Sequence, residues 1–172
     1  IAAYRALLAV QPDDGAALNN LATRYIQIGE LEQAAGLLER ALRVDSTGYQ
    51  RFSNLAALQQ SLGRLDDADR TLDAMARLFP GNPEVLHSRY QTATARFDFV
   101  AAESALVGLE GLTTLDPFLR ATVAARRGGI HALHGRYRQA RRLVADAIAT
   151  TPAEQRAVGQ ASALLQEQAV LV

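Results

Sequence analysis

Apolar residues recur along this chain at the spacing of amphipathic helices. Near the start, Leu18, Leu21, Ala22 and Tyr25 stand at i, i+3, i+4 and i+7, which places them on one stripe of a helix. Gly29 follows this stripe, and a glycine that can adopt a positive φ ends a helix at little cost. A second apolar stripe begins after Gly29, so the pattern predicts two helices joined by a short turn.

The same helix pair recurs 34 residues further along the chain. The aligned positions are Leu21/Leu55, Ala22/Ala56, Tyr25/Gln59, Gly29/Gly63, Ala34/Ala68, Leu38/Leu72 and Ala41/Met75. Among these pairs, only Tyr25/Gln59 changes chemical type. A period between about 20 and 50 residues that contains two amphipathic helices indicates a solenoid, in which stacked units share one core.

These spacings resemble those of the tetratricopeptide repeat (TPR) family. Residues 15–48 match nearly all positions of the TPR unit, with Ser46 where proline is usual, and residues 49–82 match most of them, with Pro80 in place. The resemblance implies an all-α fold, a right-handed α-solenoid of antiparallel helix pairs. It also implies that the first helix of each pair, the front helix, lines a concave groove, while the second is a back helix.

We therefore expect one TPR-like solenoid domain over residues 1–172, with about nine helices and no strands. Its expected parts are the back half of a truncated repeat (1–14), repeats at 15–48 and 49–82, a degenerate repeat at 83–116, an offset repeat at 117–154, and a capping helix or the start of a further repeat at 155–172. Because residues 1–14 read as half a unit, we expect the chain to be part of a longer protein.

The third and fourth units depart from the pattern. In the third, Arg89 stands where leucine belongs and Phe97 where the turn glycine belongs. The front helix is then either rotated or has lost part of the usual packing, and since a buried charge without a partner would cost several kcal/mol, we favour rotation. In the fourth, Asp116 and Pro117 predict a helix start, and Gly128 with the following Gly129 predicts a bend or a close neighbour.

Composition narrows the class of protein. The 172 residues include 49% hydrophobic residues, no Trp and no Cys, and 18 basic residues, all Arg, balance 18 acidic ones. Abundant Ala and Arg without Lys are typical of a GC-rich bacterial genome. No apolar run reaches the roughly 20 residues of a membrane span. Zero Cys excludes disulfides but leaves the compartment open; we favour the cytoplasm, with the periplasm as the alternative.

No catalytic constellation is visible, so we expect no enzyme activity, no cofactor and no metal within these residues. His131 and His134 stand three apart on one expected helix but lack a third ligand. The acidic run from Asp66 to Asp73 is interpreted as a solvated helix face, since the dipole favours Asp in a first turn.

The expected groove is lined by polar, mostly uncharged side chains, which can hydrogen-bond the backbone of an extended peptide. By the resemblance, the partner-binding residues are Asn19, Asn20, Thr23, Ile26, Gln27, Gln50, Ser53, Asn54, Gln60, His87, Ser88 and Gln91. Asn20 and Asn54 occupy the same position one period apart.

Charge is distributed unevenly. Residues 1–116 carry ten Arg against fifteen acidic residues, whereas residues 117–145 carry seven Arg and no acidic residue. The candidate patch for an anionic partner consists of Arg126, Arg127, Arg138, Arg141 and Arg142. Its alternative is an ordinary solvated face, and the lack of interleaved aromatics disfavours nucleic acid.

The sequence thus favours a non-enzymatic scaffold that binds an extended or helical protein segment in its groove. Two alternatives remain open: a substrate-recruiting or regulatory arm of a larger bacterial enzyme of kinase or transferase type, and a self-association module that forms a homo-oligomer.

Overall fold

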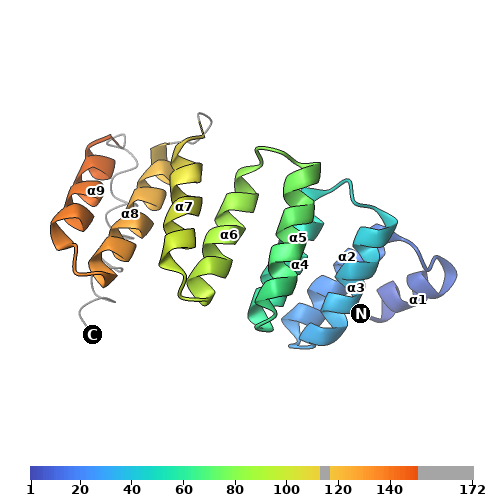
Figure 1. Ribbon diagram of the computed structural model, residues 1–172. Helices are drawn as coiled ribbons and strands as arrows, with labels where there is room; N and C mark the ends of the chain where they lie inside the picture. The colour runs from blue at the N-terminus through green and yellow to red at the C-terminus, as the bar shows by residue number, and fades with distance from the viewer. Residues whose placement is uncertain (113–116, 151–172) are drawn as a thin grey trace. The chain divides into compact units, whose positions relative to one another are not determined.

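A computed structural model describes residues 1–112 and 117–150 of the chain. Nine helices and no strand occur in these ranges (Figure 1), which confirms the all-α fold class. They are α1 (Ala2–Val10), α2 (Gly15–Gln27), α3 (Leu31–Val44), α4 (Tyr49–Ser61), α5 (Leu65–Leu78), α6 (Pro83–Ala95), α7 (Phe99–Glu110), α8 (Pro117–Leu133) and α9 (Tyr137–Thr150).

The chain divides into two compact units, Ile1–Arg96 and Phe97–Val172. The first holds α1 to α6, and the described helices of the second are α7 to α9. One continuous solenoid over residues 1–172 stays a prediction. The expected terminal segment 155–172 and the expected helix cap Asp116 lie outside the described residues.

In the first unit, the predicted apolar stripe of α2 forms the core. Leu18, Leu21, Ala22 and Tyr25 are each at most 6% exposed. The helix begins where the carboxylate of Asp14 accepts a hydrogen bond from the Ala17 amide at 2.8 Å, which satisfies one of the free N–H groups of the first turn.

The next front helix completes this core. Leu55 and Leu58 of α4 join one hydrophobic cluster with residues of α2 and α3. A second cluster around Phe52, Leu72 and Met75 also includes Val85 of α6. Each helix pair therefore buries its apolar surface with help from the following helix, as stacked repeats do.

Helix α6 lies in the rotated register that the sequence predicted. Its buried residues are Val85, Ser88, Thr92 and Ala93, while Arg89 is exposed. The apolar stripe has moved by about one residue relative to α2 and α4. This rotation places the Arg89 guanidinium 2.7 Å from the Asp73 carboxylate at the surface rather than in the core.

In the second unit, α8 and α9 pack closely through Gly128. A Cβ atom at Gly128 would lie 3.0 Å from Cγ2 of Val144 and 3.3 Å from the Ala140 carbonyl oxygen, whereas one at Gly129 would meet nothing within 4 Å. The sequence predicted either a bend or a close neighbour at this glycine pair. The structure shows the close neighbour at Gly128.

Candidate functional site

The polar residues of the first two front helices gather opposite their buried stripes. Asn20 of α2 and Asn54 of α4 are both exposed, and they stand at equivalent positions 34 residues apart. We call this surface the front-helix face. Its exposed polar members are Asn20, Thr23, Gln27, Gln50, Asn54 and Ser61.

The members of the front-helix face differ in how much bonding capacity they leave open. The hydroxyls of Thr23 and Ser61 donate to the carbonyl oxygens of Asn19 and Ala57 in their own helices, at 3.1 and 3.0 Å. Gln27 accepts a hydrogen bond from Arg24 at 2.9 Å.

Three amides of this face form no hydrogen bond with any other described residue. They are the side chains of Asn20, Gln50 and Asn54. Each offers one carbonyl acceptor and two N–H donors. The front-helix face therefore presents unused amide groups on helices whose opposite sides are fixed by the core.

The other predicted residues of α2 and α4 differ in exposure. Ile26 is 38% exposed, and Asn19 is half-buried with an Oδ1 atom that finds no hydrogen-bond donor among the described residues. The Ser53 hydroxyl lies 3.9 Å from the Met75 sulfur. Ile26 is the one predicted residue here that could supply an apolar contact.

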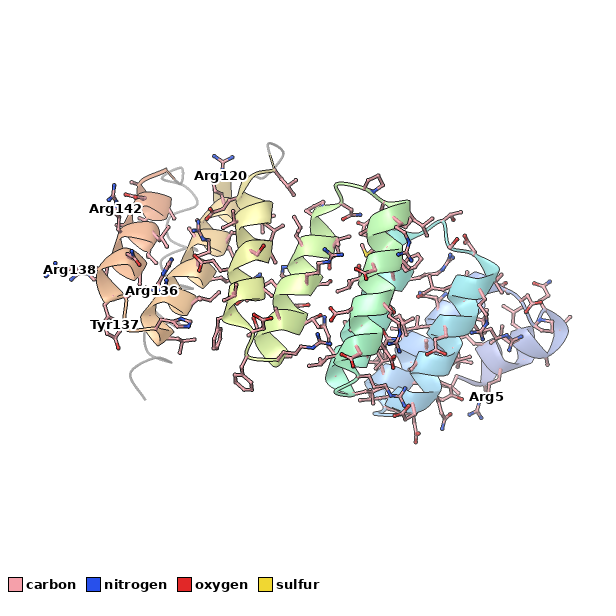
Figure 2. All side chains as sticks on the ribbon, viewed as in Figure 1. Arg5, Arg120, Arg136, Tyr137, Arg138 and Arg142 are labelled. Carbon is pink, nitrogen blue, oxygen red and sulfur yellow. The ribbon has the colours of Figure 1, made fainter. Side chains whose placement is uncertain are left out.

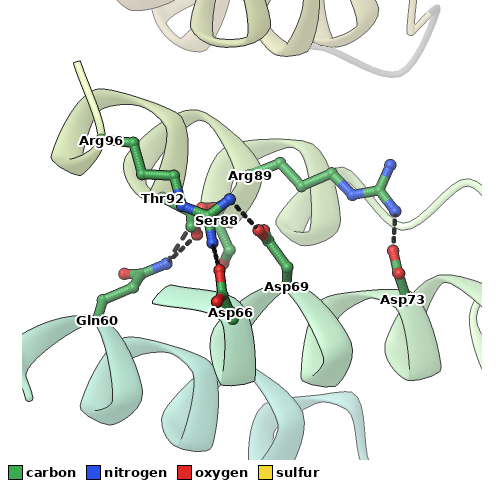
Figure 3. A network of polar contacts seen from close by, with 8 residues as sticks. All are labelled: Gln60, Asp66, Asp69, Asp73, Ser88, Arg89, Thr92 and Arg96. Atoms are coloured by element: carbon green, nitrogen blue, oxygen red, sulfur yellow. Dashed lines mark hydrogen bonds and ion pairs between the residues drawn. The ribbon is translucent and has the colours of Figure 1, made fainter. Parts of the chain in front are cut away.

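Gln60 and Ser88 belong to an internal network (Figure 3). Nε2 of Gln60 donates to the Thr92 hydroxyl at 2.8 Å and to the Ser88 carbonyl oxygen at 3.2 Å, and this joins α4 to α6. Ser88 is only 4% exposed. The expectation that Ser88 lies on an exposed binding surface is therefore corrected, because the rotation of α6 turns it inward.

The other predicted residues of α6 pair with each other. The Nε2 atoms of Gln91 and His87 lie 3.2 Å apart, and Gln91 is exposed whereas His87 is half-buried. In the 34-residue alignment, Ser88 rather than His87 or Gln91 stands at the position of Asn20 and Asn54.

The acidic run on α5 is bound by Arg96, which follows α6, and by Arg70 of α5 itself. Arg96 bridges the carboxylates of Asp66 and Asp69, the latter at 2.8 Å, and Arg70 pairs with Asp67 (Figure 3 shows the Arg96 pairs). These carboxylates therefore form ion pairs with arginine side chains. No group of three candidate metal ligands occurs in the described part of the chain.

A charged cluster between α7 and α8 was missed by the sequence analysis. Arg127 is only 18% exposed by its side chain, and its guanidinium lies 2.5 Å from Glu110 and 3.5 Å from Glu103. Nε2 of His131, which is buried, lies 3.2 Å from the same Glu103. Arg127 was expected in the anionic-partner patch. This expectation is corrected, because the charge of Arg127 is already compensated inside the second unit.

The signal for this cluster was present in the repeat alignment. Counted from Ala121, Arg127 stands where leucine belongs and His131 where Tyr25 stands in the first unit. Glu103 and Glu110 stand seven apart on α7, and so on one helix face.

The remaining arginines of the expected patch fall into two groups. Arg126 of α8 is half-buried and engaged in a further contact. Arg138, Arg141 and Arg142 are exposed on α9.

His131 and His134 do not converge on a common point. His131 faces Glu103, whereas Nδ1 of His134 lies 2.8 Å from the Ile130 carbonyl oxygen and its ring packs edge-on against Phe99 at 5.5 Å.

No helix within the described ranges combines the length and the apolar character of a membrane span.

No protein-family model matches the chain, and no curated protein sequence does. Solved structures do match. A crystal structure of MamA is 16% identical, with 86% of this chain and 84% of that chain covered and a TM-score of 0.73. A tetratricopeptide repeat protein from Parabacteroides merdae is 15% identical, with 96% and 63% covered and a TM-score of 0.70.

A third match is the APC/C hetero-tetramer Cut9–Hcn1, which is 18% identical over 96% of this chain and 32% of that chain, with a TM-score of 0.64. Identities this low show the fold alone. The fold is that of TPR-like helical repeats, which confirms the resemblance found in the sequence.

Proposed function

We propose that this chain is a non-catalytic protein-interaction module that holds an extended or helical segment of a partner protein on its front-helix face. The observation that carries the proposal is the pair Asn20 and Asn54, which are exposed at equivalent places and form no hydrogen bond with another described residue. Gln50 adds a third open amide.

The chemistry of these amides suits a peptide backbone. A side-chain amide can donate to a backbone carbonyl and accept from a backbone N–H at the same time, whatever the side chains of the ligand. Specificity then comes from apolar contacts, for which Ile26 is the available residue of α2 at 38% exposed.

The packing of the two helices lowers the cost of binding. Asn20 lies beside the fully buried Leu21 and Ala22, and Asn54 beside Leu55 and Ala56, so their backbones are held by the core. A surface held in place before binding loses little conformational entropy when a ligand is bound.

Among the structural neighbours, Cut9–Hcn1 is a hetero-tetramer, so a protein with a similar fold assembles with a second protein. This supports a role in protein interaction for the present chain. We propose the kind of partner from the chemistry of the front-helix face alone.

The test uses peptides selected on the whole chain from a random library that lacks Asp, Glu, Lys, Arg and His, so that side-chain charge does not drive binding. The selected peptide is then titrated into the wild type and the double variant Asn20→Ala/Asn54→Ala. We expect a loss of affinity of about tenfold or more, since each lost hydrogen bond is worth about 0.5–1.5 kcal/mol.

The matched control is Gln139→Ala, which removes an exposed amide from α9. It should change the affinity by less than about twofold, as surface substitutions outside a binding site do. Equal affinity for the wild type and the Asn20/Asn54 double variant would contradict the proposal.

A further inference from the structure

Helix α9 presents a basic face that the proposed function does not use. Arg138, Arg141 and Arg142 are exposed and stand three and four residues apart, which places them on one side of the helix. Figure 2 shows the side chains of Arg138 and Arg142 pointing outward from α9. Arg136 precedes the helix and is exposed as well.

The charges of this face are hardly compensated. Arg138 and Arg141 form no ion pair or hydrogen bond with the side chain of any described residue. Nε of Arg142 lies 3.8 Å from Asp146, and both side chains are strongly exposed, at 86% and 73%. An exposed pair at this distance neutralises little of the charge.

Several other arginines in the described ranges are paired with carboxylates at short distance, unlike Arg138 and Arg141. Arg51, Arg64 and Arg89 each lie within 2.7 Å of a carboxylate, and Arg127 of α8 is held by two. Within the described part of the chain, arginines on several helices are therefore paired at short distance, whereas Arg138 and Arg141 of α9 are not.

Apolar surface adjoins the basic face. Ala145 and Ala149 are exposed on the same side of α9, and small side chains there let another chain approach the helix closely. At the start of the helix, Tyr137 is 61% exposed, and Leu133 at the end of α8 is 63% exposed. Large apolar groups this exposed can anchor a partner.

We infer that the α9 face binds an acidic segment of a partner protein. Carboxylates of the segment pair with Arg138, Arg141 and Arg142, since guanidinium and carboxylate groups form bidentate hydrogen bonds. One apolar residue of the segment packs on Tyr137, which stands four residues before Arg141 on α9.

Protein is favoured over nucleic acid for two reasons. Proteins that bind duplexes tightly neutralise about 6–10 phosphates, and single-strand binders stack successive bases on several aromatic rings. Over residues 136–146, four arginines face one aspartate, and Tyr137 is the sole aromatic residue.

The test measures fluorescence anisotropy of a labelled peptide of Asp and Glu with one central Phe. The peptide is titrated into the full chain at about 50 mM salt, where exposed charges are weakly screened, and again at about 300 mM. Its comparators are the Asn/Gln analogue of the peptide and an oligothymidylate of equal formal charge.

The test variant is Arg138→Glu/Arg141→Glu. The matched control is Arg43→Glu/Arg77→Glu, which makes the same charge change at two exposed arginines of α3 and α5 that likewise show no ion pair with a described residue. Circular dichroism verifies that both variants fold.

We expect the acidic peptide to bind the wild type, to lose about tenfold or more in affinity with Arg138→Glu/Arg141→Glu, and to change less than about threefold with the control. Affinity should also fall at the higher salt concentration, and Tyr137→Ser should weaken binding at both. Four results would each overturn the inference. The acidic peptide could fail to bind at low salt, or it could lose as much affinity with the control variant. The Asn/Gln analogue could bind equally well, or the oligothymidylate could bind more tightly.

Discussion

Phe97 occupies a backbone conformation that the repeat reserves for glycine. The turn residues Gly29, Gly63 and Gly135 have φ values of 80°, 71° and 71°, and Phe97 at the equivalent turn has a φ of 59°. A bulky L-residue in this left-handed region is strained by about 1–2 kcal/mol. Packing of the Phe97 side chain offsets little of this strain energy, because the side chain is 79% exposed.

We therefore predict that Phe97→Gly raises the free energy of unfolding by about 1 kcal/mol, as measured by urea denaturation. The edge-on contact of Phe97 with Phe99, at 6.5 Å, is lost, but it covers little of the Phe97 ring, which is mostly exposed. Gly63→Ala makes the opposite change and should lower stability by a similar amount. A less stable Phe97→Gly chain would show that the ring contact outweighs the backbone strain.

The fold stabilises the Asp45 carboxylate in its charged form. Hydrogen bonds from the side chain and the backbone N–H of Thr47, and then from Arg51, lower the pKa of Asp45 from 3.8 to about 2. The folded protein thus holds this carboxylate ionised in a pH range where the unfolded chain protonates it.

The sign of the pH effect follows from this depressed pKa. Its contribution to stability is fully present above pH 3.8 and is lost as the pH falls through about 2. We predict that Asp45→Asn lowers the melting temperature at pH 7 and that its difference from the wild type shrinks below about pH 4. A difference that stays constant from pH 7 to pH 3 would contradict this origin of the stability.

At the scale of elements, the two glycines of α8 provide a matched pair. Alanine at either position improves helix propensity by about 1 kcal/mol, but a methyl group at Gly128 would press on Val144 and the Ala140 carbonyl of α9. We predict that Gly129→Ala stabilises the protein and that Gly128→Ala is less stable than it by about 2 kcal/mol. Equal stability of the two variants would show that α9 can move away at no cost.

The sequence predicted the helices and turns of the first unit well, for a physical reason. Each apolar stripe, such as Leu18 to Tyr25, follows the helical period, and each turn needs a positive φ that Gly29 and Gly63 supply. The rotation of α6 was also predictable, because Arg89 could not be buried alone.

The cluster of Arg127, His131 and Glu103 was not predicted. A repeat alignment shows where a charged residue replaces an apolar one, but it does not show which residue of the neighbouring helix will compensate the charge. That pairing depends on the rotation of α7 against α8, which is fixed by packing. The same limit applies to Ser88, whose burial follows from the rotation of α6.

At the scale of the whole molecule, two exposed surfaces of different chemistry are the ones that we propose as binding surfaces. The front-helix face carries the uncharged amides of Asn20, Gln50 and Asn54, and the α9 face carries the charges of Arg138 and Arg141. That these residues bind partners stays a prediction, but the structure separates the exposed groups from those already bonded, such as Gln60 and Arg127.

The proposed function requires that Asn20 and Asn54 do little for the fold. We predict that Asn20→Ala/Asn54→Ala changes the free energy of unfolding by less than about 1 kcal/mol, because both side chains are exposed. Differential scanning calorimetry measures this. A large loss of stability would mean that the two amides hold the fold together rather than a ligand.

The most direct test of the front-helix face is a nuclear magnetic resonance titration of the full chain with a selected uncharged peptide. We expect the side-chain amide signals of Asn20, Gln50 and Asn54 to shift together and to saturate with one dissociation constant. Saturable shifts that are confined to α3, α5 or the second unit, with these three amides unmoved, would contradict it.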